Sequence, residues 1–219
     1  MTENDRHSVA DVLPLATDPD ELARREVENG LRQFNVAMDL VKAFVHDPER
    51  PFRLRSSHIL QLNYEALQGI QAHAGTYRNS KVHISQSTHE PPEHFFVAEE
   101  VERMCDYVND CWGKRSPVHL AAYLMWKLNW IHPFADGNGR TSRMVSYVVL
   151  NIGLNSVLPG IPTIPDQIVD NKKTYYDALE RADNRLKEAG VIDVSSMEEL
   201  VEGMLATQLL RAADQAVGH

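Results

Sequence analysis

The chain has 219 residues, 43% of them hydrophobic and 24% charged, and this composition excludes a wholly disordered protein. The formal net charge of −9 argues against direct binding of nucleic acid through its phosphate backbone. The N-terminus lacks a signal-peptide pattern, and no apolar run approaches the roughly 20 residues that cross a bilayer. We therefore expect a soluble, cytoplasmic protein without a membrane partner.

Apolar residues recur with helical spacing along most of the chain. Residues 1–20 are polar with scattered prolines, and we expect them to be loosely held. Residues 21–56 should form a helical N-terminal segment, and residues 57–219 the main domain with its C-terminal helices. The periodicity predicts helices over residues 21–46, 57–72, 97–112, 117–131, 144–152, 171–189 and 195–213.

One short segment alternates instead of following the helical period. Residues 75–85 read GTYRNSKVHIS, in which apolar residues alternate around the turn-forming pair Asn79-Ser80. This pattern predicts a β-hairpin. The expected fold class is therefore all-α with one small β-hairpin.

Residues 132–143 read HPFADGNGRTSR and connect two apolar helices with a high density of chemically useful side chains. Gly137 and Gly139 can take positive φ and let backbone amides approach an anion. The next helix should begin near Arg140, so that Arg140 and Arg143 share one face at its positively polarised end. This combination predicts a clamp for a polyphosphate.

Three further side chains of the same loop suit phosphate chemistry. Asp136 offers the hard oxygen ligand that Mg²⁺ prefers. Asn138 could donate to a phosphate oxygen, and His132, with an ordinary pKa near ~6.5, could take a proton from an attacking hydroxyl. Transfer of a phosphate-linked group requires little more from a protein than positioning and charge neutralisation.

The loop matches, at every specified position, the signature His-x-Phe-x-Asp/Glu-Gly-Asn-Gly-Arg-x-x-Arg, and the chain thereby resembles the Fic (filamentation induced by cAMP) family. The sequence GTYR at residues 75–78, followed by VHI at residues 82–84, resembles the Fic flap at its usual distance upstream. The resemblance covers roughly residues 57–154 and implies a Fic-type helical domain with a hairpin flap.

The resemblance implies a protein adenylyltransferase, a nucleotidyltransferase that moves AMP from ATP to a tyrosine, threonine or serine hydroxyl of a target protein or of the enzyme itself. ATP and Mg²⁺ are the implied substrate and cofactor. By position in the motif, the implied roles are His132 as general base, Phe134 as packing beneath the loop, Asp136 as the metal ligand, Gly137, Asn138 and Gly139 as the anion-binding turn, and Arg140 and Arg143 as holders of the phosphates.

The same resemblance gives the flap a part in docking the target. A Fic flap clamps a short extended piece of the target protein by adding a strand to it. The implied docking residues are Thr76, Tyr77, Lys81, Val82, His83 and Ile84.

Many Fic proteins also carry an inhibitory Ser/Thr-x-x-x-Glu-Gly/Asn motif, whose glutamate pairs with the second motif arginine. Here Glu28, followed by Asn29, lies upstream of the core where one class places this motif, although Arg24 stands at the Ser/Thr position. We therefore expect Glu28 to pair with Arg143 and to restrain activity. A second match, at Glu202 near the C-terminus, also lacks the hydroxyl.

The sequence leaves other activities of the same loop open: removal of AMP, transfer of another phosphate-linked group, or nucleotide binding without transfer in a regulatory module. The intact Gly-Asn-Gly turn favours AMP transfer over the phosphorylating Doc branch. Fic proteins can form dimers, so a homodimer is compatible with the sequence. The target protein, the type of residue modified and the preferred base cannot be read from it.

Overall fold

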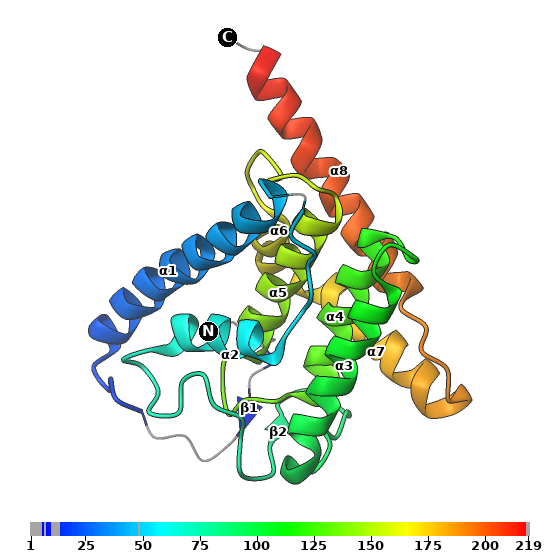
Figure 1. Ribbon diagram of the computed structural model, residues 1–219. Helices are drawn as coiled ribbons and strands as arrows, with labels where there is room; N and C mark the ends of the chain where they lie inside the picture. The colour runs from blue at the N-terminus through cyan, green and yellow to red at the C-terminus, as the bar shows by residue number, and fades with distance from the viewer. Residues whose placement is uncertain (1–5, 7, 10–13, 48, 218–219) are drawn as a thin grey trace.

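The computed structural model describes residues 6, 8–9, 14–47 and 49–217. Helices account for most of them, as predicted (Figure 1). The elements in chain order are β1 (Ser8–Val9), α1 (Pro19–Val45), α2 (Ser56–Leu67), β2 (His83–Ile84), the 3₁₀ helix η1 (His94–Phe96), α3 (Val97–Cys111), α4 (Pro117–Ile131), α5 (Asn138–Gly153), α6 (Ile164–Asp170), α7 (Lys172–Ala189) and α8 (Ser195–Val217).

Local capping explains where several helices begin. Asp18 accepts a hydrogen bond from the Glu21 amide at 2.9 Å at the start of α1, and Ser116 accepts one from the His119 amide at 3.0 Å at the start of α4. Proline stands in the first turn of both helices. The seven predicted helices are confirmed, with boundaries that shift by a few residues, whereas α6 and η1 were not predicted.

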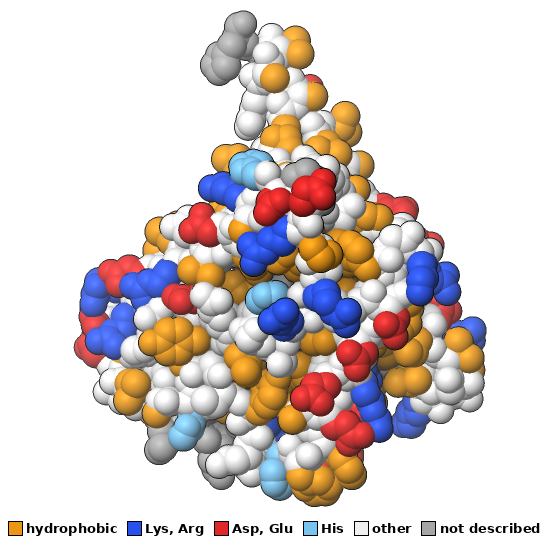
Figure 2. All heavy atoms as spheres, in the orientation of Figure 1, with side chains coloured by type: hydrophobic (Ala, Val, Ile, Leu, Met, Phe, Trp, Pro, Cys, Tyr) orange, Lys and Arg blue, Asp and Glu red, His pale blue; other side chains and the backbone are white. Residues whose placement is uncertain are grey.

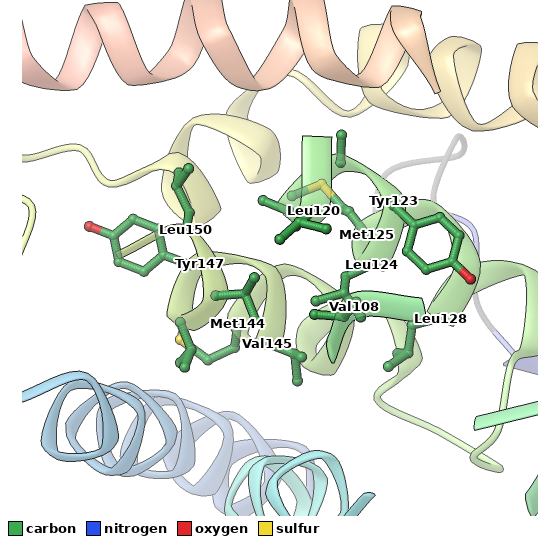
Figure 3. Close-up of a cluster of buried hydrophobic side chains, with 14 of the residues drawn as sticks. Val108, Leu120, Tyr123, Leu124, Met125, Leu128, Met144, Val145, Tyr147 and Leu150 are labelled. Carbon is green, nitrogen blue, oxygen red and sulfur yellow. The ribbon is translucent and has the colours of Figure 1, made fainter. Parts of the chain in front are cut away.

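The hydrophobic core is built around α4 and α5. Every residue from 120 to 128 in α4 is buried, which is the pattern of a helix covered on all sides. In Figure 1, α1 and α2 lie on one side of the α4–α5 pair and α3, α7 and α8 on the other. Figure 3 shows the cluster between these layers, with Leu120, Leu124 and Leu128 from α4 beside Met144, Val145 and Leu150 from α5.

Two buried amide side chains attach α1 to α2. Asn29 Nδ2 donates to the carbonyl of Gln68 at 2.9 Å, and Gln33 Nε2 donates to the carbonyl of Leu62 at 2.9 Å. Both side chains are less than 5% exposed, so these bonds are made in place of bonds to water. They position α1 beside the segment that follows α2.

The predicted β-hairpin over residues 75–85 is wrong in its pairing. Its second half forms β2, but β2 pairs antiparallel with β1 from the N-terminal segment, with Ser8 opposite Ile84 and Val9 opposite His83. The first half forms no strand, and within it the side chain of Arg78 is buried in the protein interior. Parts of the N-terminal region that we expected to be loosely held are thus in a defined place, while residues 1–5, 7 and 10–13 lie outside the described residues.

The surface mixes charge signs. Figure 2 shows acidic and basic side chains interspersed over one face, and apolar side chains along the projecting end of α8, where Leu209, Leu210 and Val217 are exposed. Within the described ranges, no helix combines the length and apolar character that a membrane crossing needs.

Arg78 ties the flap segment to the end of α4. Its guanidinium donates to the carbonyls of His132 at 2.8 Å and Ser80 at 3.0 Å, and also to that of Pro92. Its backbone amide donates to the Pro133 carbonyl at 2.9 Å. The Arg78 side chain is only 5% exposed. If it were replaced by an apolar side chain, these carbonyls would therefore lose their donors without gaining free access to water.

We therefore expect Arg78→Met to lower the free energy of unfolding by about 2–4 kcal/mol, since several buried carbonyls lose a charged donor. Chemical denaturation followed by circular dichroism measures this change. Arg53→Met is the matched control, because Arg53 is exposed, and it should change stability by less than about 0.5 kcal/mol. Equal effects of the two substitutions would contradict the clamp.

Candidate active site

The motif residues meet in the tight connection between α4 and α5. His132 ends α4 in the left-handed conformation, with φ 51° and ψ 58°, and Gly137 precedes α5 with φ 75°. The connection opens onto a cavity of about 700 Å³ that is also lined by residues of α1, α7 and the N-terminal segment. A single loop thus brings its polar groups to the wall of a space large enough for a nucleotide.

Asn138 holds the loop in shape. Its Oδ1 accepts from the Phe134 amide at 2.9 Å, and its Nδ2 donates to the Phe134 carbonyl at 2.8 Å. The side chain is 2% exposed, and its second donor contact is Ser8 Oγ at 3.3 Å. The amide that we predicted as a phosphate donor is therefore engaged within the protein.

Glycine is required at residues 137 and 139 for different structural reasons. At Gly137 the φ is positive, and a Cβ would lie 2.9 Å from Cδ1 of Leu67. Gly139 lies in the first turn of α5 and does not use the positive φ that glycine can take. A Cβ at Gly139 would instead lie 3.2 Å from Nη1 of Arg143, so the small residue keeps space for that guanidinium.

The His132 ring is oriented by contacts at both nitrogens. Nδ1 lies 3.3 Å from the Asn129 carbonyl, which can only accept, so Nδ1 carries the proton and Nε2 is left as an acceptor. Nε2 lies 2.8 Å from Ser8 Oγ. Burial lowers the pKa of His132 to about 3, and the charges of Arg78 and His89 act in the same direction. The ring is therefore a neutral base with its free nitrogen facing a hydroxyl.

The charged groups of the loop line the same cavity. Asp136 Oδ1 accepts from the Gly137 amide at 2.6 Å, and Asp136 Oδ2 lies 3.6 Å from Nη2 of Arg140. Arg140 also contacts Glu26 of α1 at 3.4 Å, and Arg143 lines the cavity one turn further along α5. The predicted clustering of Asp136, Arg140 and Arg143 is present.

The remaining predicted residues lie at different depths. Phe134 is 1% exposed and packs under the loop against Tyr77, with ring centroids 5.9 Å apart. Thr76 is exposed and donates to the His73 carbonyl at 2.8 Å. In the flap segment, Lys81 and His83 are exposed, Val82 is buried and Ile84 is half-buried.

Glu28 forms its ion pair within α1, with Arg24 instead of the arginine that we expected. Its carboxylate accepts from Arg24 at 2.6 Å on an exposed face of α1. Glu26 is the glutamate of α1 that reaches the loop, through Arg140. An ion pair between Glu28 and Arg143 does not occur among the contacts of the described residues.

Sequence reasoning missed several residues that shape the site. Asn63 of α2 donates to the Asp136 carbonyl at 3.1 Å and to Thr141 Oγ1 at 3.2 Å, and it accepts from the Gly75 amide at 2.9 Å. A polar residue amid the apolar positions of α2 was the only signal for it. Ser8 carried no signal at all, because its contacts lie more than 70 residues away in the chain.

Comparison with known proteins gives one consistent family. Residues 53–150 match the model of the Fic/DOC family. The protein adenylyltransferase Fic of Nematostella vectensis is 32% identical over 116 residues, which are 51% of this chain and 24% of that protein. The chain therefore spans about a quarter of the length of this curated relative.

Solved Fic structures share the fold. Fic-1 from C. elegans superimposes with a TM-score of 0.69 at 20% identity, covering 93% of this chain and 55% of that chain. BepC from Bartonella tribocorum, solved with bound AMPPNP, gives a TM-score of 0.53 at 16% identity, covering 86% of this chain and 88% of that chain. These matches show that the helical arrangement is that of Fic domains.

The buried His132 should make stability depend on pH in a defined direction. Its pKa is about 3 in the folded protein and near ~6.5 when unfolded, so below pH ~6.5 the unfolded chain binds the extra proton. Folding then weakens as the pH falls, by up to about 1.4 kcal/mol per pH unit from this group.

Urea unfolding of the wild type and His132→Asn between pH ~8 and ~4.5 measures this contribution. The two stability curves should be parallel at the alkaline end, and the wild type should fall more steeply below pH ~6.5. Parallel curves over the whole range would show that His132 is not held neutral by the fold.

Proposed function

Residues 53–150 of this chain match the Fic/DOC family model, and from that premise we propose that the chain transfers AMP from ATP to a hydroxyl group of a protein. The observation that carries the proposal is the approach of His132 Nε2 to a hydroxyl oxygen, at 2.8 Å, on the wall of a cavity that Arg140 and Arg143 also line. A base and a cationic cradle in one cavity are the parts that nucleotidyl transfer needs.

The triphosphate is proposed to lie against the start of α5. The first amides of this 16-residue helix have no partner within the helix and carry its positive dipole end. Arg140 and Arg143 add two guanidinium groups there, and Arg143 is proposed to hold the phosphates for attack. The name of the Nematostella vectensis relative and the AMPPNP bound to BepC support ATP as the donor.

Asp136 is the residue proposed to hold Mg²⁺. Its carboxylate lines the cavity with about a third of the side chain exposed, in keeping with an ion shared between protein and phosphates. Mg²⁺ takes one or two protein carboxylates and completes its shell with phosphate oxygens and water. Bound there, the ion would neutralise charge on the phosphates.

The attacking group is proposed to be a serine, threonine or tyrosine hydroxyl of a target protein. His132 Nε2 takes the hydroxyl proton as the oxygen bonds to the α-phosphorus and pyrophosphate leaves. The flap segment is proposed to position the target, because β2 already pairs with an extended segment and can present the same edge to another chain.

The test is transfer of label from ATP carrying a labelled α-phosphate into the proteins of a cell lysate. Wild-type protein with Mg²⁺ should label at least one band, and His132→Ala should reduce the rate by at least about 100-fold because the base is lost. His46→Ala, an exposed histidine at the end of α1, is the matched control and should keep the wild-type rate.

The position of the label separates the alternatives. Labelling from the γ-phosphate instead of the α-phosphate would contradict AMP transfer and indicate phosphorylation. Labelling that survives in His132→Ala would contradict the role of the base.

We further propose that α1 restrains this site through a glutamate. Ala23, Glu26 and Val27 of α1 line the cavity, and Glu26 contacts Arg140. Glu28 occupies the position of the inhibitory glutamate in the motif and directly follows Val27 in the chain. A carboxylate at the arginines would compete with the phosphates for them.

Separate Glu26→Gly and Glu28→Gly variants test this restraint. An inhibitory glutamate should show a several-fold rise in the rate of AMP transfer when it is removed. A rise in Glu28→Gly supports the motif position, and a rise in Glu26→Gly alone transfers the role to the residue in contact with Arg140. Unchanged rates in both variants would contradict a restraint from α1.

A further inference from the structure

Arg6 and Ser8, two described residues near the N-terminus, line the cavity of the candidate active site. β1 occupies an edge of β2, the strand that we propose docks the target (Figure 1). In this pairing Ser8 lies opposite Ile84. Two residues before Ser8, the guanidinium of Arg6 lies 4.7 Å from the centre of the Tyr176 ring and pairs with Glu180 of α7. The segment is thus anchored to the flap on one side of the cavity and to α7 on the other.

The hydroxyl of Ser8 is oriented for reaction. The Oδ1 of Asn138 accepts from the backbone amide of Phe134, which fixes the orientation of the Asn138 side chain. Its Nδ2 can therefore only donate, and it donates to Ser8 Oγ at 3.3 Å. His132 Nδ1 faces the Asn129 carbonyl, so Nε2 can only accept, and it lies 2.8 Å from the same Oγ. The hydroxyl proton therefore points at the base, and a lone pair of the oxygen remains for attack.

Other hydroxyls near the loop are arranged differently. Ser142 Oγ donates to the Gly139 carbonyl at 3.1 Å, and Thr141 is fully buried with its Oγ1 accepting from Asn63. Ser87 lines the cavity, but its Oγ accepts from the His89 amide at 3.2 Å. Of these hydroxyls, that of Ser8 lies within hydrogen-bond distance of Nε2 of His132.

We propose that Ser8 is an acceptor of AMP within its own chain. This inference rests on the proposed AMP transfer. Ser8 Oγ forms the bond to the α-phosphorus of ATP, the bond between the α-phosphorus and the bridging oxygen breaks, and pyrophosphate leaves with that electron pair. The hydroxyl proton passes to His132 Nε2. The product carries a phosphodiester at Ser8.

The covalent test is incubation of the full chain with Mg²⁺-ATP, followed by intact-protein mass and peptide mapping. Wild type should gain one AMP at Ser8, with a rate constant that does not change when the protein is diluted, because the reaction is intramolecular. Ser8→Ala should lose this product and Ser8→Thr should keep it. Thr17→Ala removes an exposed hydroxyl of the same segment and is the matched control, which should keep the product.

Modification at another residue in the wild type, or a rate constant that rises in proportion to protein concentration, would overturn the assignment. Labelling of lysate proteins by the wild type, compared with its own modification at Ser8, separates this inference from the proposed function. If lysate proteins are labelled while wild-type Ser8 stays unmodified, the Ser8 proposal is wrong and AMP transfer stands. If no variant labels either itself or lysate proteins, both the Ser8 proposal and the proposed AMP transfer are wrong.

A disulfide tests the position of the segment without reference to activity. Residues directly opposite one another in an antiparallel pair have Cα atoms roughly 4.5–5.5 Å apart, within the range that a disulfide spans. The double variant Ser8→Cys with Ile84→Cys should therefore form an intramolecular disulfide under mild oxidation, and Ser8→Cys alone should not. Failure of the double variant to cross-link would contradict the seating of β1 on β2.

Discussion

The turn from α4 to α5 is the constraint on which the site depends. It reverses the chain within a few residues, and Asn138 holds it by bonding both the amide and the carbonyl of Phe134. The turn places the end of one buried helix beside the start of another. The base at His132 and the open amides of α5 therefore face one cavity, and neither could be moved without disturbing the core beneath them.

Burial gives His132 its chemical character as well as its position. A residue in the left-handed conformation at a helix end is held there by its surroundings, and here Arg78 bonds its carbonyl while Asn129 faces Nδ1. Burial disfavours the charged ring, so the histidine stays neutral where a proton acceptor is needed. The arginines of α5 lie nearer to solvent, where they can meet a charged nucleotide.

The sequence was sufficient to predict the parts of the site that are close together in the chain. Residues 132–143 form one loop and one helix start, so the spacing of the motif fixes their relative positions, and the helical periods placed α4 and α5 on either side. Long-range pairing was not predictable in the same way. The alternation in residues 75–85 indicated a strand, but the partner of this strand was β1, while Arg78 bonds the carbonyl of His132 at the end of α4. On α1, the sequence motif selected Glu28 by its spacing along the chain. Contact with Arg140 depends instead on which face of α1 meets the loop, and that face carries Glu26.

The protonation state of His132 tests most directly whether this residue is the base. Two-bond ¹H–¹⁵N correlation spectra of the histidine rings report that state. The His132 signals are identified by their loss in His132→Asn. Near pH ~5, where a histidine with the ordinary pKa of ~6.5 is almost fully charged, we predict a neutral ring with its proton on Nδ1 and a bare Nε2. A charged ring, or a proton on Nε2, would contradict the assignment of His132 as the base.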